Sequence, residues 1–252
     1  MIVETHVHLC DEKYDGDRQE TLARAAKAGV VKFLNVSAEL KEIRKIAALE
    51  INGVYKAFGL HPHNTGEFSD EVYGEIKGYF KAQKNAVAVG EIGLDYFRST
   101  TSRADQENVF RKFLGLADQL NLPVVIHSRE AHDDVIKILK KYDLQKKGII
   151  HCFTGGAKTA AQFLDMGFVL GIGGVVTFPN TGELAAAVRN TPLDSIVLET
   201  DAPWLAPQPF RGKRNEPAYL KEIAKMIAGI KGTSAEKVEE ITAQTAARVL
   251  NI

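Results

Sequence analysis

The stretch Ile2-Val3-Glu4-Thr5-His6-Val7-His8-Leu9 indicates both the fold and the chemistry of this chain. It is short, rich in β-branched residues and alternates in kind, which is typical of a strand. Alternation places His6 and His8 on one face of that strand, with Val7 on the other. Imidazole is the side chain that most often binds metals, so the pair predicts half of a metal site if other strands deliver ligands to the same place. Two histidines that lie near a terminus by chance are the alternative.

Apolar runs with strand character alternate with amphipathic helical segments along the whole chain. Such alternation predicts parallel strands joined by crossover helices. We expect strands at residues 2–8, 31–36, 54–60, 86–94, 124–127, 148–151, 168–172 and 195–199, and helices at 19–28, 40–50, 70–82, 104–120, 131–142, 158–166, 183–189, 217–228 and 235–250. No linker or low-complexity tract interrupts this pattern, so residues 1–252 are expected to form one domain.

The eight strand–helix units predict an α/β protein with a closed (β/α)8 TIM barrel, a fold that commonly takes about 250 residues. An open doubly wound sheet is the alternative, and a glycine-rich phosphate loop in the first strand–helix turn would favour it. That turn carries His8-Leu9-Cys10-Asp11 instead. The barrel is therefore the predicted fold.

Composition limits the classes of function. The 32 basic and 32 acidic side chains give a formal net charge of zero, which argues against a surface that coats nucleic acid broadly but permits a local basic patch. No run of 18 apolar residues predicts a membrane span, and a core strand begins at Ile2 where a signal peptide would stand, so we expect a cytoplasmic protein. Cys10 and Cys152 make no disulfide framework and are expected to be reduced packing residues, with Cys152 facing away from His151.

Residues that carry chemistry collect at the carboxyl ends of the predicted strands, where TIM barrels form their active sites. A carboxylate such as Glu91 inside an apolar strand has to be bound to a metal or paired in a structural salt bridge, because an unpaired buried charge is very costly. His132 lies inside a helical pattern and is expected at the surface or in a cap. Six of the seven histidines and several acids lie at strand ends: His6, His8, His61, His63, Glu91, His127, His151, Glu199 and Asp201.

Four of these histidines with Glu91 and Asp201 are too many ligands for one metal ion at ordinary coordination. Two ions roughly 3.5–4 Å apart that share one bridging carboxylate can accommodate them, and such a pair lowers the pKa of a bound water to about 7. Imidazoles favour Zn²⁺ over Mg²⁺ as the bound ion, with Mn²⁺ or Ni²⁺ also suitable. No Ser-His-Asp or Cys-His nucleophile arrangement competes for these positions. The predicted metal ligands are His6, His8, Glu91, His127, His151 and Asp201.

Seven motifs, in order along essentially the whole chain, resemble those of the TatD-like metal-dependent deoxyribonucleases, which belong to the amidohydrolase-type barrels. They lie at residues 3–9, 59–63, 89–96, 126–129, 151–155, 198–207 and 211–217. One departure is Glu4, where the family usually has Asp two residues before the first histidine. The resemblance implies that His6, His8 and Asp201 hold one metal ion and His127 and His151 the other, with Glu91 bridging. It also implies that Mg²⁺ or Mn²⁺ supports activity even where Zn²⁺ is bound.

The function that the resemblance implies is hydrolysis of DNA phosphodiesters, as a 3′-5′ exonuclease, by a water that two metal ions activate. Asp201 and Glu91 are the expected catalytic residues, with Asp201 orienting and deprotonating the water. The implied partner is a DNA end or single strand, with no membrane and no obligate protein partner. Phosphate contacts are expected from His61, His63, Arg129, Arg211, Lys213 and Arg214, and base stacking from Tyr96, Phe97, Phe153, Trp204 and Phe210.

Two other functions remain open. A dinuclear amidohydrolase-type enzyme that acts on a small ester, amide or phosphoester would use the same two metal ions. A lysine that can be carboxylated at the end of the fourth strand would favour it, and Glu91 stands there instead. A non-catalytic metal-binding or scaffolding protein would need a lost ligand, and none is missing.

Overall fold

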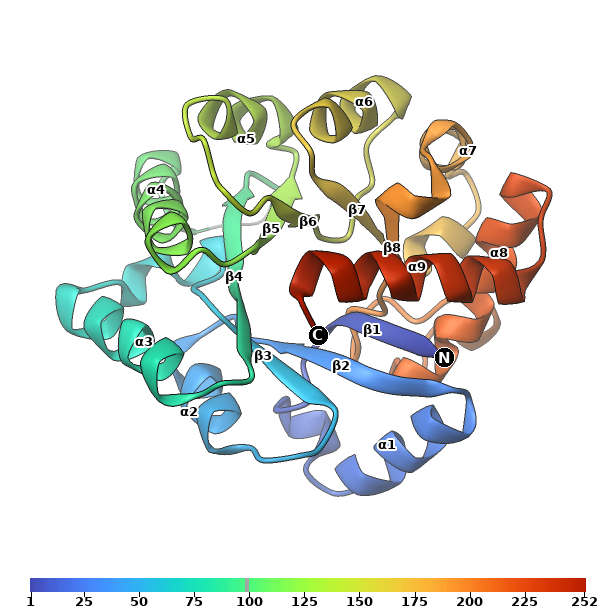
Figure 1. Cartoon of the computed structure of the whole chain (residues 1–252), viewed down its shortest axis with the longest axis horizontal. Helices are drawn as coiled ribbons and strands as arrows, with labels where there is room; N and C mark the ends of the chain where they lie inside the picture. Colours follow the sequence, from blue (N-terminus) through green and yellow to red (C-terminus); the bar gives the residue numbers. More distant parts are fainter. Residues whose placement is uncertain (98–99) are drawn as a thin grey trace.

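Eight parallel strands form a single sheet in which each strand pairs with the next one along the chain. They are β1 (Ile2–Val7), β2 (Val30–Val36), β3 (Val54–Phe58), β4 (Ala86–Asp95), β5 (Val124–Arg129), β6 (Gly148–Ile150), β7 (Val169–Ile172) and β8 (Ile196–Leu198). A parallel bridge between Val7 and Ala202 joins β1 to the segment after β8, so the sheet is nearly closed into a barrel (Figure 1). This computed structural model, which describes residues 1–97 and 100–252, confirms the predicted (β/α)8 barrel and excludes the doubly wound sheet, in which the strand order would reverse.

Helices surround the barrel and connect its strands (Figure 1). They are α1 (Arg18–Lys27), α2 (Leu40–Ala48), α3 (Asp70–Ala82), α4 (Arg103–Leu120), α5 (His132–Leu139), α6 (Ala157–Asp165), α7 (Gly182–Asn190), α8 (Leu220–Lys231) and α9 (Ala235–Leu250). Short 3₁₀ turns lie between these elements: η1 (Glu12–Tyr14), η2 (Pro62–Glu67), η3 (Gly174–Thr177), η4 (Leu193–Ser195), η5 (Gln208–Phe210) and η6 (Pro217–Tyr219). No helix in the described part of the chain is long and apolar enough to span a membrane.

Local signals in the sequence account for several helix ends. The Ser234 hydroxyl accepts a hydrogen bond from the Lys237 N–H and begins α9. Gly29 and Gly167 have positive φ directly after the C-caps of α1 and α6, whereas Gly53 has positive φ in the turn before β3, four residues after the C-cap of α2. The helix expected at 217–228 differs, because it starts as the 3₁₀ turn η6, continues as α8 and ends only at Gly232, whose φ is +65°.

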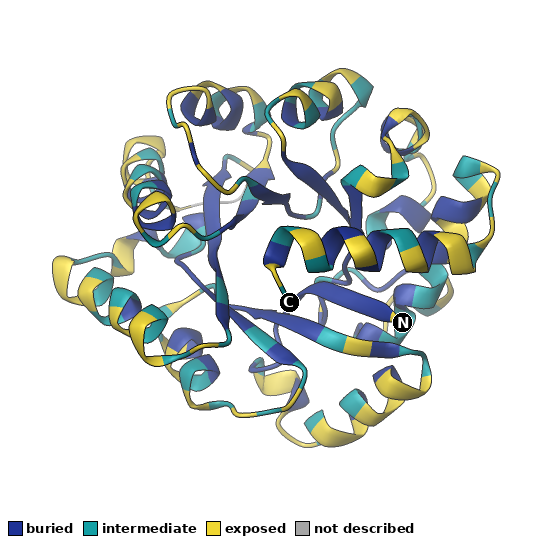
Figure 2. Ribbon diagram, in the orientation of Figure 1, coloured by how far each residue is buried: buried dark blue, intermediate teal, exposed yellow. Residues whose placement is uncertain are grey.

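The barrel interior is packed with small and branched side chains and is closed at one end by α9. Val3, Leu34, Val125 and other inward residues of the strands form one apolar cluster, which includes Leu250 and Ala246 of α9. The opposite faces of the strands pack against the surrounding helices in a second, larger cluster. Figure 2 shows the strands almost entirely buried, whereas the helices expose their outer faces. Because α9 packs against β1, β8 and the turn η4 that precedes β8, it covers the amino-terminal mouth and leaves the carboxyl ends open.

Shortening Leu250 tests whether α9 is the plug of the barrel. Leu250 is 1% exposed, so Leu250→Ala removes buried apolar surface, leaves a cavity and should lower the free energy of unfolding by about 2–5 kcal/mol. Urea denaturation followed by far-UV circular dichroism measures the change. Gln244→Ala, on the exposed face of the same helix, should change stability by less than about 0.5 kcal/mol. Equal effects of the two substitutions would contradict the packing of α9.

Candidate metal centre

All six side chains predicted to bind metal lie together at the carboxyl ends of the strands. His6, Glu91 and His127 belong to β1, β4 and β5. The other three follow their strands: His8 and His151 come directly after β1 and β6, and Asp201 comes three residues after the end of β8. The Asp201 backbone has φ +56°, and its N–H donates to the His6 carbonyl, so the end of the last strand is held against the first one.

Glu91 is the side chain that faces both groups of histidines. Its Oε2 lies 3.3 Å from Nε2 of His6. Its Oε1 lies 2.7 Å from Nδ1 of His127 and 3.8 Å from Nε2 of His151. A carboxylate that presents one oxygen to each group has the geometry that a bridging ligand needs.

Asp201 completes the group on the β1 side of the centre. Its Oδ1 lies 3.6 Å from Nε2 of His8 and 4.0 Å from Nε2 of His6, and these two nitrogens are 3.2 Å apart. The same oxygen is 3.9 Å from Nε2 of His151. The Asp201 side chain is 17% exposed whereas that of Glu91 is only 3% exposed, so Asp201 is the carboxylate that solvent or a ligand at the mouth can reach.

Burial and the neighbouring charges set the protonation of this cluster. Burial alone would raise the pKa of Glu91, but His61, His151 and His6 hold that pKa well below its ordinary value. Partial burial would raise the pKa of the Asp201 carboxyl, but its hydrogen bond with His8 and the nearby imidazoles lower that pKa. Burial and the nearby His151 lower the pKa of His6. Charged carboxylates beside a neutral imidazole are the donor set that a divalent cation requires.

Three further carboxylates lie behind the histidines. Nδ1 of His8 is 3.1 Å from Glu42, Nε2 of His127 is 3.0 Å from Asp95, and Nδ1 of His151 is 3.0 Å from Glu199. Each carboxylate faces the ring nitrogen that points away from the centre, which leaves the lone pair of the other nitrogen for a metal. Despite burial, Glu42 and Asp201 raise the pKa of His8 well above its ordinary value, so a cation there takes the place of a proton.

The donor set therefore fits divalent metal ions. Four imidazoles and two carboxylates converge, and their outward nitrogens meet carboxylates in the pattern common around metal-binding histidines. Glu199 is one of the acids predicted at strand ends and Asp95 lies in the motif at residues 89–96, but the sequence does not show that either carboxylate contacts a histidine of the centre. Glu42 carried no signal at all, because it lies on helix α2 and nothing local in the sequence shows that it reaches His8.

Glu4 is not one of the predicted ligands, but it holds two segments of the centre by hydrogen bonds. Its Oε2 accepts a 2.7 Å hydrogen bond from the Thr200 hydroxyl, and its Oε1 accepts hydrogen bonds from the backbone N–H groups of Thr200 and His6. Burial raises the pKa of this carboxyl to about 8. The longer side chain that stands in place of Asp thus holds the turn that carries Asp201, and it removes no predicted ligand.

His61 lies inside the centre and His63 beside it. Nε2 of His61 is 3.3 Å from Nδ1 of His127 and 3.7 Å from Oε1 of Glu91. Burial lowers the pKa of His61 to about 3, and its Nδ1 accepts a hydrogen bond from the His63 N–H. The neutral ring therefore carries its proton on Nε2 and presents a donor to the centre. The His63 ring is 37% exposed, with Nε2 3.0 Å from Oδ2 of Asp95.

The predicted basic contacts differ in their surroundings. Arg129 lies at the exposed end of β5, two residues after His127, with its guanidinium 4.2 Å from the centre of the Phe97 ring. Arg211 covers the Phe178 ring at 4.0 Å, and Lys213 is exposed. The Arg214 guanidinium is held by carboxylates, with Nη1 2.6 Å from Asp17 and Nη2 3.0 Å from Glu216. A phosphate contact from Arg214 stays a prediction. Because two carboxylates already bind its guanidinium, Arg214 is the weakest candidate among the predicted phosphate-binding residues.

Two residues near the centre differ from expectation, Cys152 fully and His132 in part. Cys152 does not face away from His151, because β6 ends at Ile150 and Cys152 turns with φ +44°, which brings its sulfur within 4.8 Å of ligand atoms of His151 and Asp201. His132 is half-buried at the first residue of α5, so it lies at the start of the helix rather than on the open surface, with its Nδ1 2.7 Å from the Ser128 hydroxyl and its ring stacked on Phe153. Cys10 is a free, buried packing residue, as expected.

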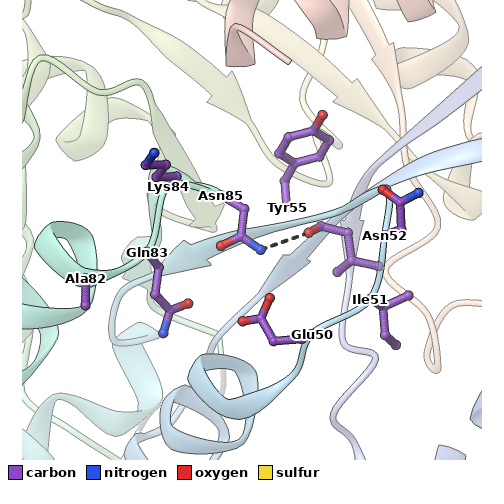
Figure 3. A pocket seen from close by; sticks show the side chains of 10 residues that line it. Glu50, Ile51, Asn52, Tyr55, Ala82, Gln83, Lys84 and Asn85 are labelled. Carbon is purple, nitrogen blue, oxygen red and sulfur yellow. Dashed lines mark hydrogen bonds between the residues drawn. The ribbon is translucent and has the colours of Figure 1, made fainter.

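A polar hollow of about 570 Å³ lies at the opposite end of the barrel, near the amino ends of β3 and β4 (Figure 3). Its wall includes Glu50, Tyr55 and Gln83. The buried Lys56 ammonium binds Glu50 and Gln83 at 2.8 Å each, and the Asn85 amide donates to the Val54 carbonyl. These groups satisfy one another, so the hollow is a structural feature and the chemistry lies at the carboxyl ends.

A (β/α)8 barrel with this donor set at its open mouth defines a metal-dependent hydrolase. The family model described as TatD related DNase matches residues 3–251, and the chain belongs to this TatD family. It is 39% identical to the uncharacterized metal-dependent hydrolase YabD of Bacillus subtilis (strain 168), with all of both chains covered. It is 35% identical to the 3′-5′ ssDNA/RNA exonuclease TatD of Cronobacter sakazakii, over 96% of this chain and 95% of that one.

Solved structures agree with this assignment. The crystal structure of YjjV, a TatD homologue from Escherichia coli K12, superposes with a TM-score of 0.95 at 30% identity, covering 100% of this chain and 98% of that one. A TatD family hydrolase of Entamoeba histolytica shares the fold with a TM-score of 0.89 at 22% identity, covering 99% and 97% of the two chains. The predicted family is thus confirmed.

Metal binding should stabilise the fold. A ligand that binds only the folded state adds about 2.7 kcal/mol at 100 times its Kd, so Mn²⁺ or Zn²⁺ added to metal-free protein should raise the free energy of unfolding by at least that amount. Urea denaturation with and without chelator measures the gain. Glu91→Gln should lose most of it, whereas Glu107→Gln, on the outer helix α4, should keep it. An equal gain in both variants would contradict the site.

Proposed function

We propose that this protein is a deoxyribonuclease that hydrolyses phosphodiester bonds of DNA from the 3′ end with two divalent cations. The observation that carries the proposal is the position of Glu91 between two groups of imidazoles, with the partly exposed Asp201 beside one of them. In this proposal His6, His8 and Asp201 hold one cation and His127 and His151 the second, with Glu91 between them. When bound, the two cations would lower the pKa of a water and offset charge on the phosphate oxygens.

The side chains of the centre would position and deprotonate the water. Asp201 is the carboxylate at the mouth, so it is placed to accept the proton of the attacking water. His61 presents its Nε2–H into the centre and would donate a hydrogen bond to a phosphate oxygen. Arg129, with its exposed guanidinium at the end of β5, would hold a flanking phosphate, and His63 would contact the same phosphate or the leaving oxygen.

Exposed aromatic rings beside the centre support a nucleic-acid substrate over a small amide. Trp204 and Phe97 are 42% and 45% exposed and lie in the segments that follow β8 and β4. Lys13 lies 5.3 Å from the Trp204 ring, and Trp204 also lines a groove of about 240 Å³ next to His8. A ring that stacks bases next to a cation that meets phosphates is typical of sites for single strands.

The other stacking candidates are less available. Phe153 is 2% exposed and packs against His132 and Phe163. Phe210 stacks flat on Tyr219, with ring centres 3.8 Å apart. The Arg103 guanidinium covers Tyr96 at 4.0 Å. Trp204 and Phe97 are more exposed than these three rings, and because Arg129 covers one face of Phe97, Trp204 is the stronger base-stacking residue of the two.

Product analysis on end-labelled single-stranded DNA tests the proposal. We expect mononucleotides released from the 3′ end with Mg²⁺ or Mn²⁺ and no product with chelator. A panel of small amides and esters and a generic phosphodiester serve as alternative substrates. Hydrolysis of amides alone would overturn the deoxyribonuclease proposal and favour the amidohydrolase alternative.

Asp201→Asn should lower kcat by roughly 10²- to 10⁴-fold, because the amide cannot accept the proton of the water. Asparagine tolerates the left-handed backbone at this position, so the variant should keep the fold. Steady-state kinetics on the DNA substrate measures the loss. Asp133→Asn, an exposed residue of the first turn of α5, is the matched control and should keep full activity. A fully active Asp201→Asn protein refutes the proposed role.

Trp204 should report on and contribute to DNA binding. It is the only tryptophan of the chain, so its fluorescence should be quenched when an oligonucleotide binds in the presence of chelator. Trp204→Ala should weaken binding by about 1–3 kcal/mol and Trp204→Phe by less, because phenylalanine keeps a stacking face. Anisotropy of a labelled oligonucleotide measures the affinities. Met226→Ala, which removes another exposed apolar side chain, should change nothing. Unquenched fluorescence together with full affinity of Trp204→Ala would contradict this role.

A further inference from the structure

His6 and His151 stand side by side although they serve different halves of the centre. Their rings are stacked, with centres 3.4 Å apart and planes 22° from parallel. Nε2 of His6 faces Glu91 at 3.3 Å, and Nε2 of His151 lies 3.8 Å from Glu91 and 3.9 Å from Asp201. Both rings therefore turn Nε2 toward the centre. In each ring Nδ1 is the nitrogen that points away from the centre.

One buried carboxylate lies behind both rings. Glu199 follows β8 and is 0% exposed. Its Oε1 is 3.0 Å from Nδ1 of His151, and ligand-capable atoms of His6, His151 and Glu199 all lie within 4.8 Å of one another. Within residues 1–97 and 100–252, Nδ1 of His6, Nδ1 of His151 and Oε2 of Glu199 are buried polar atoms without an aligned hydrogen bond. Nδ1 of His151 is therefore a donor to this carboxylate, and Nδ1 of His6 is the unpartnered donor of the ring stacked on His151.

The neighbouring backbone holds Glu199 at this place. The Cys152 N–H donates to Oε1 at 2.5 Å, which fixes one oxygen. On β7, Gly171 leaves room for the other, because a Cβ atom at Gly171 would lie 2.2 Å from Oε2 and 2.7 Å from the carboxyl carbon. Side-chain contacts that close do not occur without movement, so any larger residue at position 171 would displace the carboxylate.

We propose that Glu199 is a positioning residue shared by both halves of the metal centre. This inference rests on the proposed function, in which His6 and His151 bind different cations. In this inference Nε2 of each ring is directed at its own cation and both Nδ1–H groups donate to the one carboxylate, which would orient the two rings together. Glu42 differs, because its Oε1 lies beside His8 whereas its Oε2 accepts a hydrogen bond from the Ala38 N–H, so it supports one half of the centre. Loss of Glu199 should therefore weaken the binding of both cations, whereas loss of Glu42 should weaken the binding of one.

Calorimetric titration of metal-free protein with Mn²⁺ tests the shared role. For the wild type we expect two binding steps. Glu199→Gln should raise both dissociation constants by roughly 10- to 100-fold, and Glu42→Gln should raise only one by that factor. Far-UV circular dichroism of the metal-free variants checks that they fold. A folded Glu199→Gln protein that changes one step or neither overturns the shared role and leaves the proposed function standing.

Two further measurements keep the test independent of that variant. Gly171→Ala changes no polar group but displaces the carboxylate, so it too should raise the dissociation constants of both Mn²⁺-binding steps. A folded Gly171→Ala protein with unchanged dissociation constants contradicts the inference.

In wild-type protein labelled with ¹⁵N-histidine and saturated with Zn²⁺, NMR should show His6 and His151 each protonated on Nδ1, with the Nδ1–H resonance shifted downfield by the carboxylate. Absence of that signal for either histidine overturns the proposal. A wild type that binds a single Mn²⁺ refutes the two-cation function itself, and the shared role with it.

Discussion

The centre depends on one buried carboxylate that meets several imidazoles. Glu91 sits 3% exposed in the middle of β4, where an unpaired charge would be very costly, and His6, His127 and His151 lie within 4 Å of its two oxygens. Those histidines come from three other strands, so they converge on Glu91 only if the sheet closes. Closure of the barrel therefore brings these charged side chains together at one end. Helix α9 and the contact between β1 and the segment after β8 stabilise that closed arrangement.

Much of this arrangement is predictable from local pattern. Alternation along Ile2–Val7 places His6 on the same face as the next histidine, and the repeated strand–helix pattern brings all strand ends to one rim. The six predicted ligands are therefore found together, because each lies in the carboxyl-terminal half of its own strand or shortly after it. The acid within an apolar run at Glu91 was also informative, since burial leaves a carboxylate few alternatives to a cation or a buried partner.

The remaining features depend on contacts between residues far apart in the sequence. Glu42 reaches His8 from a helix, and no period along α2 indicates which loop that side chain meets. Arg214 looks like a phosphate ligand in sequence, yet Asp17, which lies 197 residues away, binds its guanidinium. Cys152 faces the centre because β6 ends at Ile150, one residue before its predicted end, and strand ends are the least certain part of any pattern. These are tertiary effects, and only the folded chain reveals them.

The most direct test of the account is anomalous diffraction from crystals of the protein soaked in Mn²⁺. The account predicts two peaks roughly 3.5–4 Å apart on either side of the Glu91 carboxylate, one beside His6 and His8 and the other beside His127. A single peak, or peaks that lie away from Glu91, would contradict the central claim that this carboxylate joins two cation sites.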